Sequence, residues 1–148
     1  MTFRHPLVVL ALALPLVVAS SCTKEQPFRK PTTKVVGKVT VDGAAPDPAV
    51  QVECVAVGGM DASHPTFSRS DTREDGSFEI STYETGDGVP PGEYVLTFLQ
   101  QPFNVMSRNY GADKFKGRYA DAKKSEHKFT VAEGDPPVDL GTFDLKSK

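Results

Sequence analysis

Residues able to perform acid–base or nucleophilic chemistry are few and scattered in this chain of 148 residues. It has three histidines and two cysteines, whereas catalysis near neutral pH needs a titratable group that a neighbouring side chain holds in place. The sequence suggests no such grouping, and His64 and His127 are expected to be solvated. Cys54 alternates with valines, which predicts a buried, unreactive thiol. We therefore expect no catalytic centre and no cofactor, and predict that the protein is not an enzyme.

Acidic residues between positions 71 and 76 raise the question of a calcium loop. An EF-hand loop beginning at Asp71 needs an oxygen ligand at its third position and a glutamate at its twelfth. Those positions hold Arg73 and Thr82. The dipeptide Asp75-Gly76 instead predicts a tight hairpin turn, and no metal site is expected.

A lysine–aspartate isopeptide bond is a second alternative, with Lys34 or Lys38 joined to Asp139 or Asp144. Such a bond also needs an acid buried beside the pair, and the sequence does not place one. Lysines on an edge strand more simply prevent pairing with other chains.

Segment 103–124 is the most promising place for a binding site, because it is the longest stretch without a regular pattern. Long loops are often functional. Six basic residues and two aspartates leave it with four excess positive charges, among aromatic residues. One interpretation is a recognition surface for an envelope protein or a carbohydrate; the other is a connection whose aromatic residues cap one end of the fold. The candidate binding residues are Phe103, Tyr110, Lys114, Phe115, Lys116, Arg118 and Tyr119.

The N-terminus predicts export. A basic start precedes an uncharged apolar run, Leu7–Val18, which is shorter than the roughly 20 helical residues needed to span a bilayer. The following Ala19-Ser20-Ser21-Cys22 resembles a bacterial lipobox, which implies acylation of Cys22 and attachment to a membrane through lipid. Ala19 stands where a lipobox usually has leucine, so ordinary secretory cleavage before an unmodified Cys22, giving a secreted protein, remains the alternative.

The next residues predict a spacer. Segment 22–33 is polar and contains two prolines, and a flexible chain of this length reaches about 18 Å. Thr23 follows the cysteine where many bacteria place an aspartate for inner-membrane retention. We expect a cell-envelope location, at the outer membrane or the periplasmic face.

Overall charge excludes a protein that binds nucleic acid through bulk positive charge. Lys and Arg total 17 and Asp and Glu total 19, for a formal net charge of −2. Glycine and proline number 12 each, which favours many turns and few long helices.

Alternating apolar residues predict seven short strands. Phe67 is the expected inward residue of the third strand, and Gly141 is expected to mark a bulge in the last. The fold class is therefore an all-β, seven-stranded antiparallel Greek-key sandwich, immunoglobulin-like in size. The expected strands are 35–42, 50–57, 66–72, 77–81, 93–99, 126–131 and 138–145.

Three motifs, 36–46, 72–78 and 88–96, resemble the carboxypeptidase regulatory-like domain, which implies a transthyretin-like (prealbumin-like) sandwich over 34–148. Segments 117–125, 129–131 and 140–145 are similar to predicted bacterial lipoproteins that carry one such domain. The expected organisation is a signal peptide at 1–21, a lipidated flexible tether at 22–33 and this domain at 34–148.

The resemblance implies a non-catalytic binding or accessory module of the envelope. A self-associating structural component is the first alternative. A transthyretin-related hydrolase is less favoured, because those enzymes carry several His and Arg residues and a Tyr-Arg-Gly-Ser-like C-terminus, whereas this chain ends Asp144-Leu145-Lys146-Ser147-Lys148.

Overall fold

A computed structural model describes residues 27–147, so the expected signal peptide at 1–21, Cys22 and the first tether residues lie outside the described part. The described residues form nine strands and no helix, which confirms the predicted all-β class. The strands are β1 (Val35–Val41), β2 (Gln51–Ala56), β3 (Ser68–Asp71), β4 (Ser77–Glu79), β5 (Gly92–Leu99), β6 (Phe103–Asn104), β7 (Asn109–Tyr110), β8 (Lys128–Val131) and β9 (Val138–Leu145).

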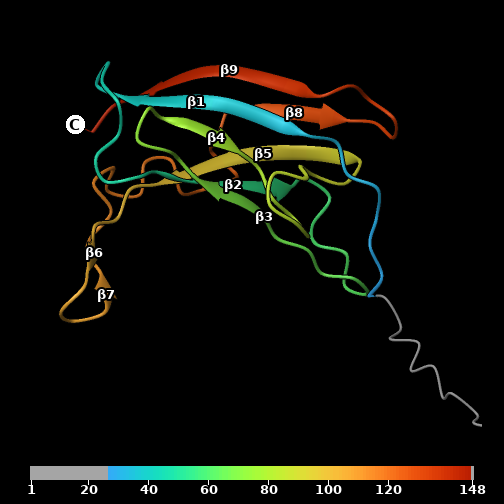
Figure 1. Cartoon of the computed structure of the whole chain (residues 1–148), viewed down its shortest axis with the longest axis horizontal. Helices are drawn as coiled ribbons and strands as arrows, with labels where there is room; N and C mark the ends of the chain where they lie inside the picture. Colours follow the sequence, from blue (N-terminus) through green and yellow to red (C-terminus); the bar gives the residue numbers. More distant parts are fainter. Residues whose placement is uncertain (1–26, 148) are drawn as a thin grey trace, which may run out of the picture.

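Seven of the strands form two sheets that lie against each other (Figure 1). One has the order β4-β1-β9 and the other the order β3-β2-β5-β8. The expected count of seven was wrong, because β6 and β7 add a separate hairpin inside the segment expected to be irregular.

The expectation of purely antiparallel sheets was also wrong, since β1 and β9 run parallel. The chain leaves the four-stranded sheet after β8 and crosses to the other sheet, where β9 arrives in the same direction as β1. Their register shifts between Val36, opposite Asp139, and Lys38, opposite Thr142. The extra residue lies at Gly141, whose φ of 74° suits glycine, so the predicted irregularity is confirmed.

The core lies between the two sheets. Val39 and Phe78 come from the three-stranded sheet, and Val52, Leu96 and Phe98 come from the four-stranded sheet; none is more than 1% exposed. Burial of each such side chain contributes about 1.5–3 kcal/mol, so alternation of apolar residues is enough to hold the layers together.

The body begins before residue 34. Thr33 pairs with Val89 through two backbone hydrogen bonds of 2.9 and 3.0 Å, and it is buried. Phe28 packs its ring against His64, with 3.8 Å between centroids, and the Lys30 ammonium lies 2.7 Å from the Asp61 carboxylate. The second half of the expected flexible tether is therefore docked on the domain.

The two histidines differ in their surroundings. His64 is exposed, as expected for a loop residue. His127 was expected to be solvated but is half-buried, because its ring meets Phe98 and Phe143 edge to face at 5.7 and 5.0 Å.

Candidate binding site along strand β3

The β6–β7 hairpin projects from the body on the side of edge strand β3 (Figure 1). Phe103 and Tyr110 pair across it, with 5.1 Å between ring centroids. The Asn104 side-chain oxygen accepts hydrogen bonds from the backbone N–H groups of Met106 and Ser107, which shapes the turn. This local pairing displays apolar groups to solvent: Phe103 is 52% exposed, Tyr110 69% and Met106 97%.

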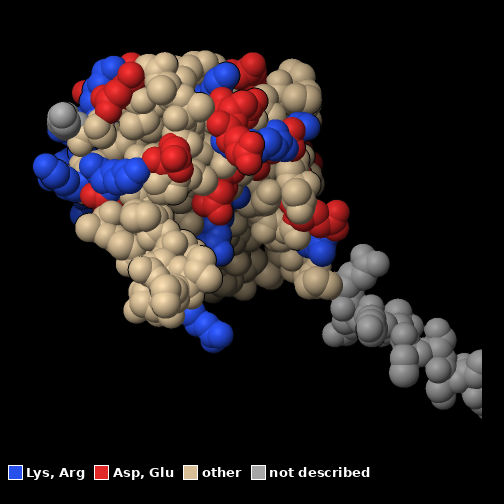
Figure 2. All heavy atoms as spheres, turned by 60° about the vertical axis from the view of Figure 1, so that its left-hand side comes forward, with Lys and Arg blue, Asp and Glu red and all other residues tan. Residues whose placement is uncertain are grey.

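The hairpin carries little charge. Arg108 is the only charged residue from 101 to 112. Figure 2 shows the hairpin as a largely uncharged projection, with a basic side chain at its lower end and the acidic side chains on the body above. The same view shows the surface hollowed between the hairpin and the body.

The other predicted aromatic residues do not belong to this surface. Phe115 is 2% exposed and lies in the core, and Tyr119 packs partly buried against it, edge to face, with 5.2 Å between centroids. The burial of these two rings agrees with the capping interpretation, and neither ring belongs to the exposed aromatic surface. An apolar ring near the end of a sandwich gains more from burial than from exposure.

The predicted basic residues are also separate from the exposed aromatic pair. The Lys114 ammonium donates to the Asp47 carbonyl oxygen at 2.6 Å, and the Arg118 guanidinium donates to the Lys146 carbonyl oxygen at 3.2 Å. Lys116 is exposed, at a turn with φ of 54°. Arg118 lies beside an aromatic residue of the predicted set, with its guanidinium 6.0 Å from the ring centre of Tyr119, but that ring is not one of the exposed pair.

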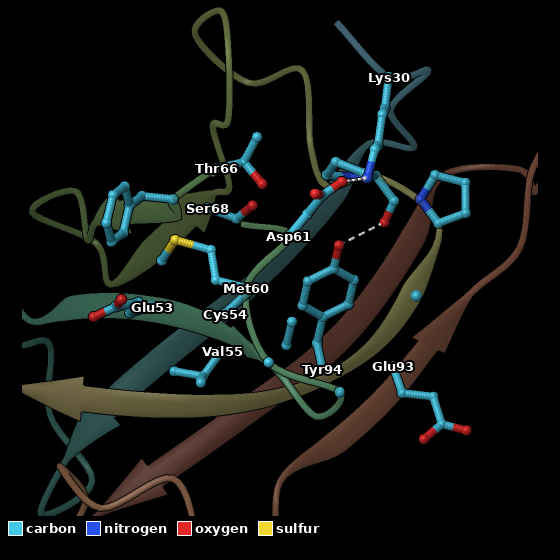
Figure 3. A pocket seen from close by; sticks show the side chains of 17 residues that line it. Lys30, Glu53, Cys54, Val55, Met60, Asp61, Thr66, Ser68, Glu93 and Tyr94 are labelled. Carbon is cyan, nitrogen blue, oxygen red and sulfur yellow. Dashed lines mark hydrogen bonds and ion pairs between the residues drawn. The ribbon is translucent and has the colours of Figure 1, made fainter. Parts of the chain in front are cut away.

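One hollow, of about 610 Å³, opens where β2 ends and β3 and β5 begin (Figure 3). Lys30, Met60 and Asp61 line it beside Tyr94, whose hydroxyl donates to the Pro90 carbonyl oxygen at 2.8 Å. The Lys30 ammonium and then the backbone N–H groups of Ser63 and His64 lower the pKa of Asp61 to about 2. The Asp61 carboxylate is therefore ionised at neutral pH.

Cys54 also lines this hollow but is 6% exposed. Burial raises the pKa of its thiol to about 12, with a smaller contribution from the charge of Glu53. Because the thiolate is the nucleophile, this cysteine is inert at neutral pH. The structure confirms one part of the prediction made from the sequence, that Cys54 is buried.

A second hollow, of about 660 Å³, runs along the outer face of β3. Its floor includes Gln51, Arg69 and Asp71, and Phe67 and Tyr110 stand at its sides. Thr66 and Phe67 line both hollows, so the two lie next to each other along this edge of the sheet.

Phe67 was expected to point inward and does not; it is 60% exposed. Its neighbour Ser68 pairs with Cys54 and is buried, so Phe67 lies on the opposite face of the strand. Sequence reasoning missed Gln51, Arg69 and Asp71 as site residues. Their alternation with inward residues could have predicted that these three side chains face outward. Only the pairing of β2 with β3 brings them together on one surface.

Two of the residues considered for an isopeptide bond, Asp144 and Lys34, have other partners. The Asp144 carboxylate accepts hydrogen bonds from the Thr40 hydroxyl and the Gly43 N–H, each at 2.9 Å. The Lys34 ammonium lies 3.4 Å from Glu79.

Within residues 27–147 there is no cluster of three or more His, Cys, Asp or Glu side chains placed to hold a metal ion. In the same part of the chain, no helix has the length and apolar character to cross a membrane.

Comparison with models of known protein families finds no match for the chain. Comparison with curated proteins also finds no match. A solved structure that it resembles is a 9R-lipoxygenase from Cyanothece PCC8801, with 14% sequence identity and a TM-score of 0.36. That match covers 78% of this chain and 16% of the lipoxygenase chain, and it supports no inference about fold or activity.

Proposed function

We propose that this protein is a lipid-anchored, non-catalytic module of the bacterial cell envelope that acts by binding. The observation that carries the proposal is the aromatic-sided hollow along β3, where Phe67 and Tyr110 are exposed beside paired strands. Exposed aromatic side chains next to a rigid sheet provide contact area with little loss of conformational freedom on binding.

The finer fold assignment is part of this proposal. We place the domain among carboxypeptidase regulatory-like, transthyretin-like Greek-key sandwiches. The orders β4-β1-β9 and β3-β2-β5-β8 support it, because the chain changes sheet four times: after β1, after β3, after β4 and after β8. The turn at Asp75-Gly76, between β3 and β4, belongs to one of the motifs that carry the resemblance.

Anchoring through an acylated Cys22 places the domain close to a membrane. Because residues 28–33 lie on the body, only five Cα–Cα steps separate Cys22 from Pro27, a reach of at most about 18 Å. The expected location is the outer membrane or the periplasmic face. Metabolic labelling with palmitate tests it: the full chain should incorporate label and sediment with membranes, whereas Cys22→Ala should do neither. Equal membrane association of both forms would contradict the anchor.

Binding is tested by immobilising the full chain and passing detergent extracts of the cell envelope over it. A protein or glycan should be retained by the wild type and lost with Tyr110→Ala. Val57→Ala is the control, because Val57 is another exposed apolar residue, 52% exposed, that lines neither hollow. Retention that is the same for all three forms, or absent from all, would contradict a binding role for this surface.

A self-associating structural role is a second candidate, favoured by the exposed tip of the hairpin. Val105 is 77% exposed and Met106 97% exposed, and burial of both against another copy would be favourable. Sedimentation of the full chain in detergent would show oligomers that Met106→Asp disrupts. A monomer at all concentrations would exclude this candidate.

A further inference from the structure

The outer face of β2 and β3 carries four planar polar side chains, of Gln51, Glu53, Arg69 and Asp71, and all but Glu53 line the hollow. Pairing places Gln51 directly opposite Asp71 and Arg69 opposite Glu53. The alternate residues Val52 and Cys54 point into the core, so Gln51 and its partner Asp71 face outward, as does Arg69, two residues before Asp71. In the described part of the chain, the side chains of Gln51, Arg69 and Asp71 form no hydrogen bond or ion pair, so their polar atoms remain available to a ligand.

Aromatic side chains border this polar floor. Phe67 and Tyr110 are 60% and 69% exposed, and Tyr83 also lines the hollow. The docked N-terminal segment holds Tyr83 in place: its hydroxyl accepts a hydrogen bond of 3.2 Å from the Lys30 N–H, and the Arg29 guanidinium lies 5.9 Å from its ring centre. Pairing with Phe103 holds Tyr110. The walls are therefore supported before any ligand arrives.

From this arrangement we infer that the hollow along β3 binds a neutral saccharide chain. This rests on the proposed binding function and names its ligand class. A carboxylate, an amide and a guanidinium each present two polar atoms in one plane, which suits adjacent hydroxyl groups, and aromatic faces suit the C–H faces of a sugar ring. The volume of about 660 Å³ falls within the usual range for small-molecule sites.

Other ligand classes fit this surface less well. An anion would be attracted by Arg69 but repelled by Asp71, which stands on the same face of the same strand. A purely apolar ligand would leave the three polar side chains desolvated. Addition of a peptide strand to β3 is opposed because the Arg69 backbone already pairs with Ser81, through hydrogen bonds of 3.0 and 3.1 Å.

The test titrates the full chain, expressed in bacteria and purified in detergent, with hexamers of β-1,4-glucose, β-1,3-glucose, α-1,4-glucose and N-acetylglucosamine. Calorimetry measures the affinity. Tyrosine fluorescence gives a second readout, because the chain has four tyrosines and no tryptophan. At least one hexamer should bind. Tyr110→Ala should weaken it at least tenfold, Asp71→Asn and Gln51→Ala several-fold, and the controls Val57→Ala and Glu133→Gln less than twofold. Binding by none of the hexamers, or equal binding by wild type and Tyr110→Ala, would overturn the assignment.

A second arm separates a free polysaccharide from a glycolipid headgroup. The unanchored Cys22→Ala chain is floated with phosphatidylcholine vesicles with and without a glucosyl glycerolipid, so that flotation reports the sugar and not the lipid anchor. Flotation only with the glycolipid identifies a headgroup, and binding only to soluble hexamers identifies a free chain. If an envelope protein is retained through Tyr110 while no saccharide binds in either arm, the saccharide assignment fails and the proposed binding function stands.

Discussion

The rings of Phe115 and Tyr119 meet edge to face, with 5.2 Å between their centroids, at the margin of the hydrophobic core. The rings of Phe103 and Tyr110 lie at a similar separation, 5.1 Å, on a hairpin exposed to solvent. Four aromatic residues from one segment of the chain thus form two pairs with different roles.

The first prediction separates these roles. Phe115→Ala should lower the free energy of unfolding by about 3–5 kcal/mol, because it leaves a cavity in the core. Phe103→Ala should cost less than about 1 kcal/mol, since Phe103 is half-exposed. Urea denaturation followed by circular dichroism measures both. Similar losses for the two variants would contradict the assignment of only one pair to the core.

The second prediction concerns the Lys30–Asp61 pair that docks the N-terminal segment. The pKa of Asp61 in the folded protein is about 2, below its ordinary value, so its charged form stabilises the folded state above the unfolded pKa near 4. That contribution should disappear as the pH falls from about 4 towards 2. The measurement is the difference in unfolding free energy between wild type and Asp61→Asn at each pH, because the other acidic groups are common to both chains. A difference that does not shrink on acidification would count against the ion pair.

The third prediction compares two glycines with nearly the same backbone conformation. Gly76 has φ of 84° and Gly134 has φ of 82°. A Cβ atom at Gly76 would lie 2.1 Å from the Val39 carbonyl oxygen, whereas one at Gly134 would have no neighbour within 4 Å. Gly134→Ala should cost about 1 kcal/mol through the left-handed conformation alone, and Gly76→Ala clearly more, because the turn must also move away from β1. Thermal unfolding measures both, and equal losses would refute the close approach of this turn to β1.

The fourth prediction concerns the thiol of Cys54. In Cys22→Ala it is the one remaining cysteine, and it should react slowly with a disulfide reagent at pH 8 while the protein is folded. Burial raises the pKa of this thiol to about 12, so little thiolate is present and the sulfur is covered. In urea the reaction should reach the rate of an unfolded cysteine. Rapid reaction of the folded protein would mean that the thiol is accessible through the hollow beside it.

The sequence alone predicted what local pattern controls. Alternation of apolar residues located the seven strands of the two sheets to within a few residues, because one face of each strand must be buried. The positive φ at Gly76 followed from Asp75-Gly76, and the irregularity of β9 from Gly141. Among the aromatic candidate site residues, Phe103 and Tyr110 are the two that the structure leaves exposed.

Only the tertiary structure decided which residues meet. Within residues 103–124, aromatic and basic residues alternate without a period, so nothing local distinguishes Phe115, which enters the core, from Tyr110, which stays in solvent. Phe67 faces outward because the register of β3 against β2 turns its neighbour Ser68 inward, and a shift of one residue would reverse both. Gln51 lies 20 positions from Asp71 in the chain, and it is strand pairing, a non-local interaction, that brings them together.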